Sequence, residues 1–158
     1  MNQILHIAAL CNRVIKETGT RNPFEMAEAL DVRVQFCPDF QKLQGMYKVI
    51  LHQPFIFLNG NLRRREAREI LAHELGHHLL HREMGENSVV QDSFLIDMTL
   101  KPEYEANLFA AQLLIDEKAF LSLLKQGYSI GEAARLLKVS LPLAELKLRI
   151  LQEEKKLP

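Results

Sequence analysis

The segment from His73 to His77 reads His-Glu-Leu-Gly-His and places two imidazoles four residues apart, with a carboxylate beside the first. On a helix, residues four apart lie on the same face, so both rings can reach one metal ion at about 2.0–2.1 Å. Glu74 lies about 100° further round the helix, close enough to hold a water molecule but angled away from direct ligation. The spacing therefore predicts His73 and His77 as metal ligands and Glu74 as a general base.

Apolar residues surround this motif on several helix faces, at Ile70, Leu71, Leu75, Leu79 and Leu80. The pattern predicts that the imidazoles and the carboxylate are buried. Because buried polar groups without partners are costly, a metal site is favoured over a chance match or a pair of structural histidines. A structural zinc site is disfavoured, since such sites commonly include cysteine and none lies near the motif. Gly76 is expected to permit the close approach of another element.

A catalytic zinc ion takes three protein ligands and leaves a position for water, so a third ligand is needed. The candidates lie at the start of another predicted helix that has a buried apolar stripe. Glu103 lies on that stripe and is the preferred ligand, whereas Glu105 lies nearer its edge and remains the alternative. For either glutamate, the simpler interpretation is a favourable charge at a helix N-terminus. Asn107 is placed to accept the free N–H of a ligating histidine.

The neighbouring histidines are treated separately. His81 follows His77 by one turn, where it either lines the cleft or is a partly exposed histidine at a helix end. His78 points away from the site and is expected to be structural. Tyr47, Tyr104 and His81 are the candidates for stabilising an oxyanion, but none has positional support, so that role stays unassigned.

The elements that position these residues follow from hydrophobic periodicity and from cap and turn residues. Helices are predicted at 4–16, 23–30, 62–82, 102–115, 117–126, 130–138 and 141–153, with Asn61 capping the third. Strands are predicted at 32–36, 46–51 and 55–58, and the polar stretch 83–92 is expected to be loop. The expected fold is α+β, a small, mostly antiparallel sheet packed against a helical core with extra carboxy-terminal helices.

Composition limits the possible partners and location. The 158 residues carry 20 Lys plus Arg and 20 Asp plus Glu, so no overall field draws the chain to nucleic acid or to an anionic membrane. The chain starts without a leader pattern and has no apolar run long enough to span a bilayer, which predicts a cytoplasmic protein.

Cys11 and Cys37 are expected to be buried thiols. The length predicts one domain over residues 1–158.

Taken together and in order, these motifs resemble the ImmA/IrrE family of metallopeptidases. The resemblance rests on Asn-Pro-Phe-Glu-Met-Ala at 22–27, Phe-Ile-Phe-Leu-Asn at 55–59, the motif at 73–77 and Glu-Tyr-Glu-Ala-Asn-Leu-Phe-Ala-Ala at 103–111. It implies one Zn²⁺ per chain, held by two histidines and a glutamate. It also implies an intracellular endopeptidase that cleaves a helix-turn-helix repressor of a phage, a mobile element or a stress response. The sequence departs from the family at Gln112 and Ile115-Asp116, where relatives tend to have glutamate and Met-Pro.

Residues 129–158 form a carboxy-terminal extension whose pattern resembles a helix-turn-helix. Its second helix opens with Leu141-Pro142-Leu143-Ala144, which is apolar where base-contacting Arg, Asn or Gln are expected. Packing onto the peptidase or against a protein partner is therefore favoured over DNA contact. The alternative function is a DNA-binding or sensory regulator that retains a metal site.

The run Phe55, Ile56, Phe57 and Leu58, just before the metal-binding helix, is expected to form a strand near the cleft. If that strand lies at the edge of the sheet, its unpaired backbone groups can take an extended substrate as an added strand. In the expected reaction, Glu74 accepts the proton of the attacking water and passes it to the leaving amine.

Overall fold

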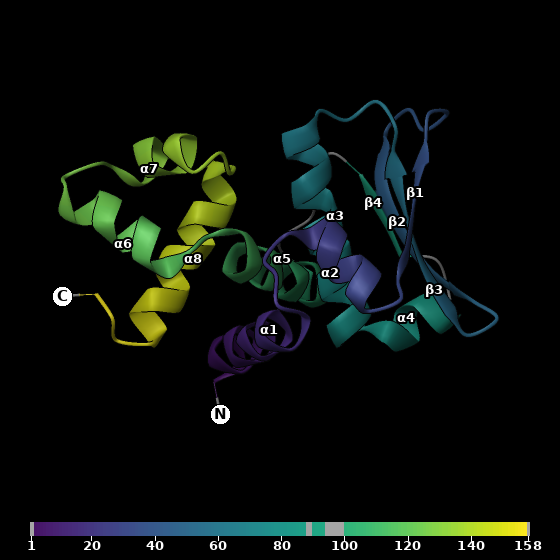
Figure 1. Ribbon diagram of the computed structural model, residues 1–158, viewed down its shortest axis with the longest axis horizontal. Helices are drawn as coiled ribbons and strands as arrows, with labels where there is room; N and C mark the ends of the chain where they lie inside the picture. Colours follow the sequence, from purple (N-terminus) through teal and green to yellow (C-terminus); the bar gives the residue numbers. More distant parts are fainter. Residues whose placement is uncertain (1, 88–89, 94–99, 158) are drawn as a thin grey trace.

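The computed structural model describes residues 2–87, 90–93 and 100–157. Its helices are α1 (Gln3–Thr18), α2 (Pro23–Ala29), α3 (Arg64–Leu80), α4 (Arg82–Asn87), α5 (Lys101–Leu114), α6 (Glu117–Lys125), α7 (Ile130–Leu136) and α8 (Leu141–Glu153). Its strands are β1 (Arg33–Cys37), β2 (Leu43–Ile50), β3 (Gln53–Asn59) and β4 (Val90–Ser93). The sheet lies at one end of the molecule, α6, α7 and α8 lie at the other, and α5 runs between them (Figure 1).

The strands form one mixed sheet in the order β1-β3-β2-β4. β1 is parallel to β3, whereas β2 is antiparallel to both β3 and β4. α3 packs on β2 and β3, and α2 packs on α3 and β1. The predicted α+β class and the mostly antiparallel sheet are therefore confirmed. Within the described ranges, no helix is both long and apolar enough to cross a membrane.

β3 is an inner strand, so the condition under which residues 55–58 could take up an extended substrate, a place at the edge of the sheet, is not met. Ile56 is paired with Val34 of β1 on one side and with Tyr47 of β2 on the other. The physical reason is that β1 aligns beside β3 in parallel and engages the backbone groups that the β2–β3 hairpin leaves unpaired. An inner strand offers no free ladder of N–H and C=O groups, so it cannot accept a substrate as an added strand.

The start of α3 also differs from the prediction, because Arg63 rather than Asn61 is its N-cap residue. The Arg63 N–H donates to the Glu66 carboxylate at 3.2 Å. Asn61 instead stabilises the turn after β3: its side-chain amide donates to the Pro38 carbonyl at 2.9 Å, and its backbone N–H donates to Asn59 Oδ1 at 2.8 Å. The Asn61 side chain therefore bonds to a segment distant in sequence instead of capping α3.

The segment 83–92, predicted to be loop, contains most of α4 and the greater part of β4. α4 packs on β2, where Gly85 lies so close to the Tyr47 ring that a side chain would not fit. β4 extends the sheet by pairing with β2. Both elements are too short to show a periodic pattern, and both depend on packing or pairing with β2 rather than on intrinsic propensity.

α5 is the central helix, and α1, α3 and α8 all pack on it. Two hydrogen bonds in series join α8, α5 and α1: Lys147 of α8 donates to Gln112 Oε1 of α5 at 2.7 Å in the interior, and Gln112 Nε2 donates to Asn12 Oδ1 of α1 at 2.8 Å nearer the surface. Burial lowers the pKa of Lys147 from 10.5 to about 8. The carboxy-terminal helices are therefore attached through polar as well as apolar contacts.

α3 and α5 cross in close contact at Gly76. A Cβ atom added to Gly76 would lie 3.0 Å from the Cα and 3.0 Å from the carbonyl oxygen of Ala106. That is closer than a Cβ normally approaches backbone atoms, so a side chain here would force the helices apart. The expected close approach of another element at Gly76 is confirmed.

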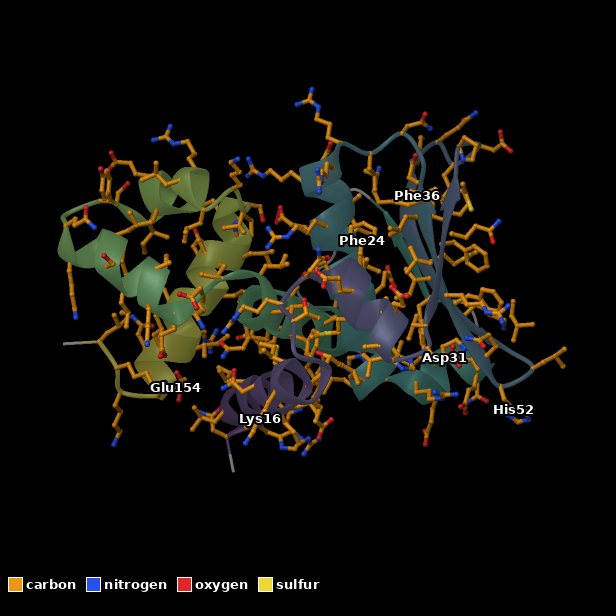
Figure 2. The ribbon with its side chains drawn as sticks, viewed as in Figure 1. Lys16, Phe24, Asp31, Phe36, His52 and Glu154 are labelled. Carbon is orange, nitrogen blue, oxygen red and sulfur yellow. The ribbon has the colours of Figure 1, made fainter. Side chains whose placement is uncertain are left out.

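The turn between β2 and β3 provides a test of the fold. Leu51 and His52 have φ of 49° and 68°, and His52 lies at the tip of the hairpin (Figure 2). Two-residue turns with positive φ favour Asn-Gly, because a Cβ atom is crowded in this conformation. The double change Leu51→Asn with His52→Gly should raise the free energy of unfolding by about 1 kcal/mol or more in urea denaturation. A variant no more stable than the parent would contradict the turn geometry.

Candidate metal centre

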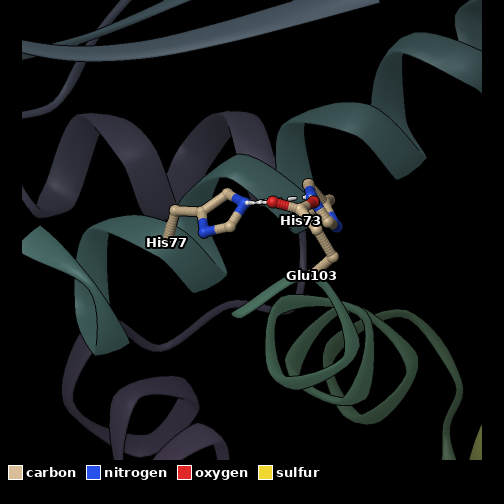
Figure 3. A group of neighbouring side chains, drawn as sticks. All are labelled: His73, His77 and Glu103. Atoms are coloured by element: carbon tan, nitrogen blue, oxygen red, sulfur yellow. Dashed lines mark hydrogen bonds and ion pairs between the residues drawn. The ribbon is translucent and has the colours of Figure 1, made fainter. Parts of the chain in front are cut away.

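Three side chains from two helices meet at one point (Figure 3). His73 Nε2 lies 2.9 Å from Glu103 Oε2 and 3.1 Å from His77 Nε2. His77 Nε2 lies 3.2 Å from Glu103 Oε1. Both histidines are buried, and the Glu103 side chain is 13% exposed. The structure thus brings two histidines of α3 to a glutamate in the first turn of α5, and it places the alternative ligand Glu105 elsewhere.

The three separations fit a single metal ion. Ligands held about 2.0–2.1 Å from an ion in tetrahedral geometry lie roughly 3.3 Å from one another. The observed separations are 2.9, 3.1 and 3.2 Å. Two imidazole nitrogens and one carboxylate also form a donor set typical of catalytic zinc, with a fourth position left for water or substrate. The residues present therefore suit a divalent metal with one open position.

Glu74 is fully buried next to this group. Its carboxylate lies against β2 at Gly45, where an added Cβ would lie 2.9 Å from Glu74 Oε1 and 2.6 Å from a methyl carbon of Ile70. Gly45 therefore makes the space that the carboxylate occupies. Glu74 is not one of the three side chains that converge on the candidate metal position.

The second ring nitrogen of each candidate ligand also has a polar partner. His73 Nδ1 lies 2.9 Å from Asn107 Oδ1, the residue proposed for this role from the sequence. His77 Nδ1 lies 3.0 Å from His81 Nδ1, and His81 Nε2 lies 3.0 Å from Glu105 Oε1. Bonds of this kind fix the orientation of metal-binding imidazoles. Both helices thus supply the ligands and the groups that orient them.

If His77 bound a metal through Nε2, this would fix which ring nitrogen of His77 and of His81 carries a proton in the hydrogen-bonded series from His77 to Glu105. With its Nε2 lone pair directed at a metal, His77 carries its proton on Nδ1 and donates it to His81 Nδ1. His81 then carries its own proton on Nε2 and donates to Glu105. Burial lowers the pKa of His81, which favours the neutral ring that this arrangement requires. Gln3 of α1 donates to the other Glu105 oxygen, so the chain extends to a third helix.

The remaining candidates lie outside the metal group. His78 Nδ1 lies 2.8 Å from the Tyr47 hydroxyl. Burial, with a smaller effect from Arg82, lowers the pKa of His78 to about 4, and burial raises the pKa of Tyr47 to about 12. They therefore form a neutral buried pair. The Arg149 guanidinium lies over the Tyr104 ring, 5.7 Å from its centroid. Among the residues that the structure describes, no contact of Tyr47 or Tyr104 supports the oxyanion role considered for them.

A cleft of about 800 Å³ opens beside His73 and Asn107, between α3 and the start of α8. Gln44 of β2 also lines it; this side chain is 8% exposed, and its Oε1 has no hydrogen-bond partner in the described part of the chain. Sequence analysis missed the cleft because its two walls are about seventy residues apart in the chain and share no motif. The apolar opening of α8 was the only signal.

Comparison with known proteins identifies the family of this chain. Residues 27–149 match the family model of the IrrE N-terminal-like domain, Peptidase_M78. The chain is 30% identical over 142 residues to uncharacterized immunity region protein 2 of Bacillus phage phi105, covering 89% of this chain and 88% of the phage protein. It is 30% identical over 139 residues to metallopeptidase ImmA of Bacillus subtilis (strain 168), covering 85% and 79%. The chain therefore belongs to the ImmA/IrrE family of metallopeptidases.

Proposed function

We propose that this protein is a zinc-dependent endopeptidase, with one Zn²⁺ per chain, that cuts a specific helix-turn-helix repressor of a phage, a mobile element or a stress response. The observation that carries the proposal is the meeting of His73, His77 and Glu103 beside the buried carboxylate of Glu74. One relative is named a metallopeptidase and another is named for a phage immunity region, which supports a substrate of this kind. Such a substrate would place the protein in the cytoplasm.

In this proposal His73, His77 and Glu103 hold the zinc ion. Zinc bound there would supply Lewis-acid chemistry, polarising a carbonyl group and acidifying a water molecule. Glu74 accepts the proton of the attacking water and delivers it to the leaving amine. Asn107 and His81 hold the two imidazoles in the orientation that directs each Nε2 at the same point.

The alternative, a DNA-binding or sensory regulator, has less support. A recognition helix presents the side chains of its first turns to base edges in the major groove. In α8, Leu143 and Ala144 are 5% and 0% exposed, and the helix packs on α5 and α1. That face of α8 is already occupied by the protein itself. Duplex DNA is therefore not proposed as a partner.

Separate roles for Glu74 and Glu103 give a direct test. Glu74→Gln keeps the shape of the side chain but removes the proton acceptor, so it should retain about one zinc per chain and lose nearly all cleavage of a cognate repressor. Glu103→Ala removes a ligand, so it should lose zinc as well as cleavage. Zinc is measured by elemental analysis after reconstitution and dialysis, and cleavage by gel electrophoresis.

Glu105→Ala is the matched variant for Glu103→Ala, because both remove a carboxylate from the first turns of α5. If Glu105→Ala strips the zinc while Glu103→Ala retains it, the ligand assignment is wrong. If the zinc-loaded parent cuts neither a repressor encoded beside its gene nor any other protein, the proposed peptidase function is wrong.

The hydrogen-bonded chain behind His77 predicts an effect on zinc affinity. His81→Ala removes the acceptor of the His77 Nδ1 proton, so the affinity for zinc should fall by roughly 10–100-fold in competition with a chromophoric chelator. Asn107→Ala should act similarly through His73. His78→Ala is the control on the same helix: it removes the bond to Tyr47, so it should lower stability while leaving zinc affinity close to that of the parent. Parental zinc affinity in His81→Ala would contradict the orienting role.

A further inference from the structure

The cleft beside the metal centre has apolar side chains on both walls. Ile70, one turn before Glu74, lies on the α3 wall, and Pro142, Leu143 and Leu146 lie on the α8 wall. Leu143 and Leu146 are only 5% and 6% exposed, so their side chains are packed in place rather than loose on the surface. A concave, mostly apolar surface next to a reaction centre is the usual form of a binding site for an apolar group.

The cleft is continuous with the candidate metal centre. His73, a candidate ligand, and Asn107, which contacts it, line the cleft themselves. A polypeptide whose scissile carbonyl lies at the metal must therefore pass along or next to this space. In an extended chain, successive side chains point in opposite directions. One of the residues close to the cut bond would then direct its side chain into the cleft.

A polar contact between the two walls fixes the shape of the cleft. The backbone N–H of Ser140 donates to Glu69 Oε1 at 3.2 Å, which holds the start of α8 against α3 beside the cleft.

We propose that this cleft is the subsite for an apolar side chain adjoining the cut bond, and that the start of α8 determines the size of side chain that fits. The inference rests on the proposed peptidase function and extends it by naming a substrate class, an extended segment with an apolar residue at this position. It also gives the carboxy-terminal helices a role in substrate selection. The wall residues are not part of the proton-transfer chemistry, so changing them should alter which bond is cut rather than whether bonds are cut.

The test is a cleavage-site profile of the zinc-loaded protein. A denatured, thiol-alkylated cognate repressor serves as the probe, with the residues on either side of its cut bond replaced in turn by apolar residues of different size, and each new N-terminus is labelled and identified by mass spectrometry. The parent should show an apolar preference at one position next to the cut. Leu143→Ala enlarges the cleft and should shift that preference towards larger apolar residues, whereas Leu143→Phe should shift it towards smaller ones. The ratio of large to small residues should change about 10-fold or more in each direction.

Ile70→Ala provides the second variant on the opposite wall, because Ile70 is only half-buried and its replacement threatens folding less. It should shift the preference in the same direction as Leu143→Ala. Leu141→Phe is the control on α8: this residue is 45% exposed and does not line the cleft, so the parental profile should persist. Zinc content and thermal unfolding are measured for every variant.

The outcomes separate the two proposals. A zinc-loaded parent that cuts no protein overturns the proposed function, and the inference about the cleft falls with it. A parent that cuts proteins without an apolar preference, or folded Leu143 and Ile70 variants with the parental profile, overturns the inference and leaves the peptidase function standing. An equal shift in Leu141→Phe also overturns it, since the effect would then not arise in the cleft.

Discussion

The close crossing of α3 and α5 at Gly76 is the constraint on which the candidate site depends. His73 and His77 lie on either side of Gly76 on α3, and Glu103 lies one turn before Ala106 on α5. Because the two backbones touch at Gly76 and Ala106, the short distance between helices brings a carboxylate to within 2.9–3.2 Å of both imidazoles. A larger side chain at the crossing would separate the helices and move the third ligand away from the other two.

Burying so many polar groups in one place requires partners for each of them. Asn107 lies against His73, and His81 and Glu105 form a chain behind His77 that ends at Gln3. Since a buried group without a partner is destabilising, this arrangement lets a polar site exist inside an apolar core. The same hydrogen bonds connect the site to α1, which lies far from α3 in sequence, because Gln3 of α1 donates to Glu105.

The positions that could be predicted from the sequence are those that depend on the spacing of residues within one helix. The His73 and His77 pair on one helix, Glu103 in the first turn of α5, and Asn107 one turn later all follow from helical periodicity. The predictions that were wrong concern residues whose structure depends on contacts between segments distant in sequence. Asn61 is predicted as a cap but donates to Pro38, residues 83–87 and 90–92 lie in elements that pack on or pair with β2, and β3 is an inner strand because β1 pairs with it. The cleft was missed for the same reason, since α3 and α8 meet only in the folded chain.

The proposed zinc ion would be held by α3 and α5 through His73, His77 and Glu103. The most direct test is a crystal structure of the zinc-reconstituted protein, with anomalous difference maps recorded on both sides of the zinc absorption edge. We expect one strong peak per chain, about 2.0–2.2 Å from His73 Nε2, His77 Nε2 and a Glu103 oxygen, with no other protein ligand. A peak bound instead by His81 and Glu105, or no peak at a full equivalent of added zinc, would contradict it.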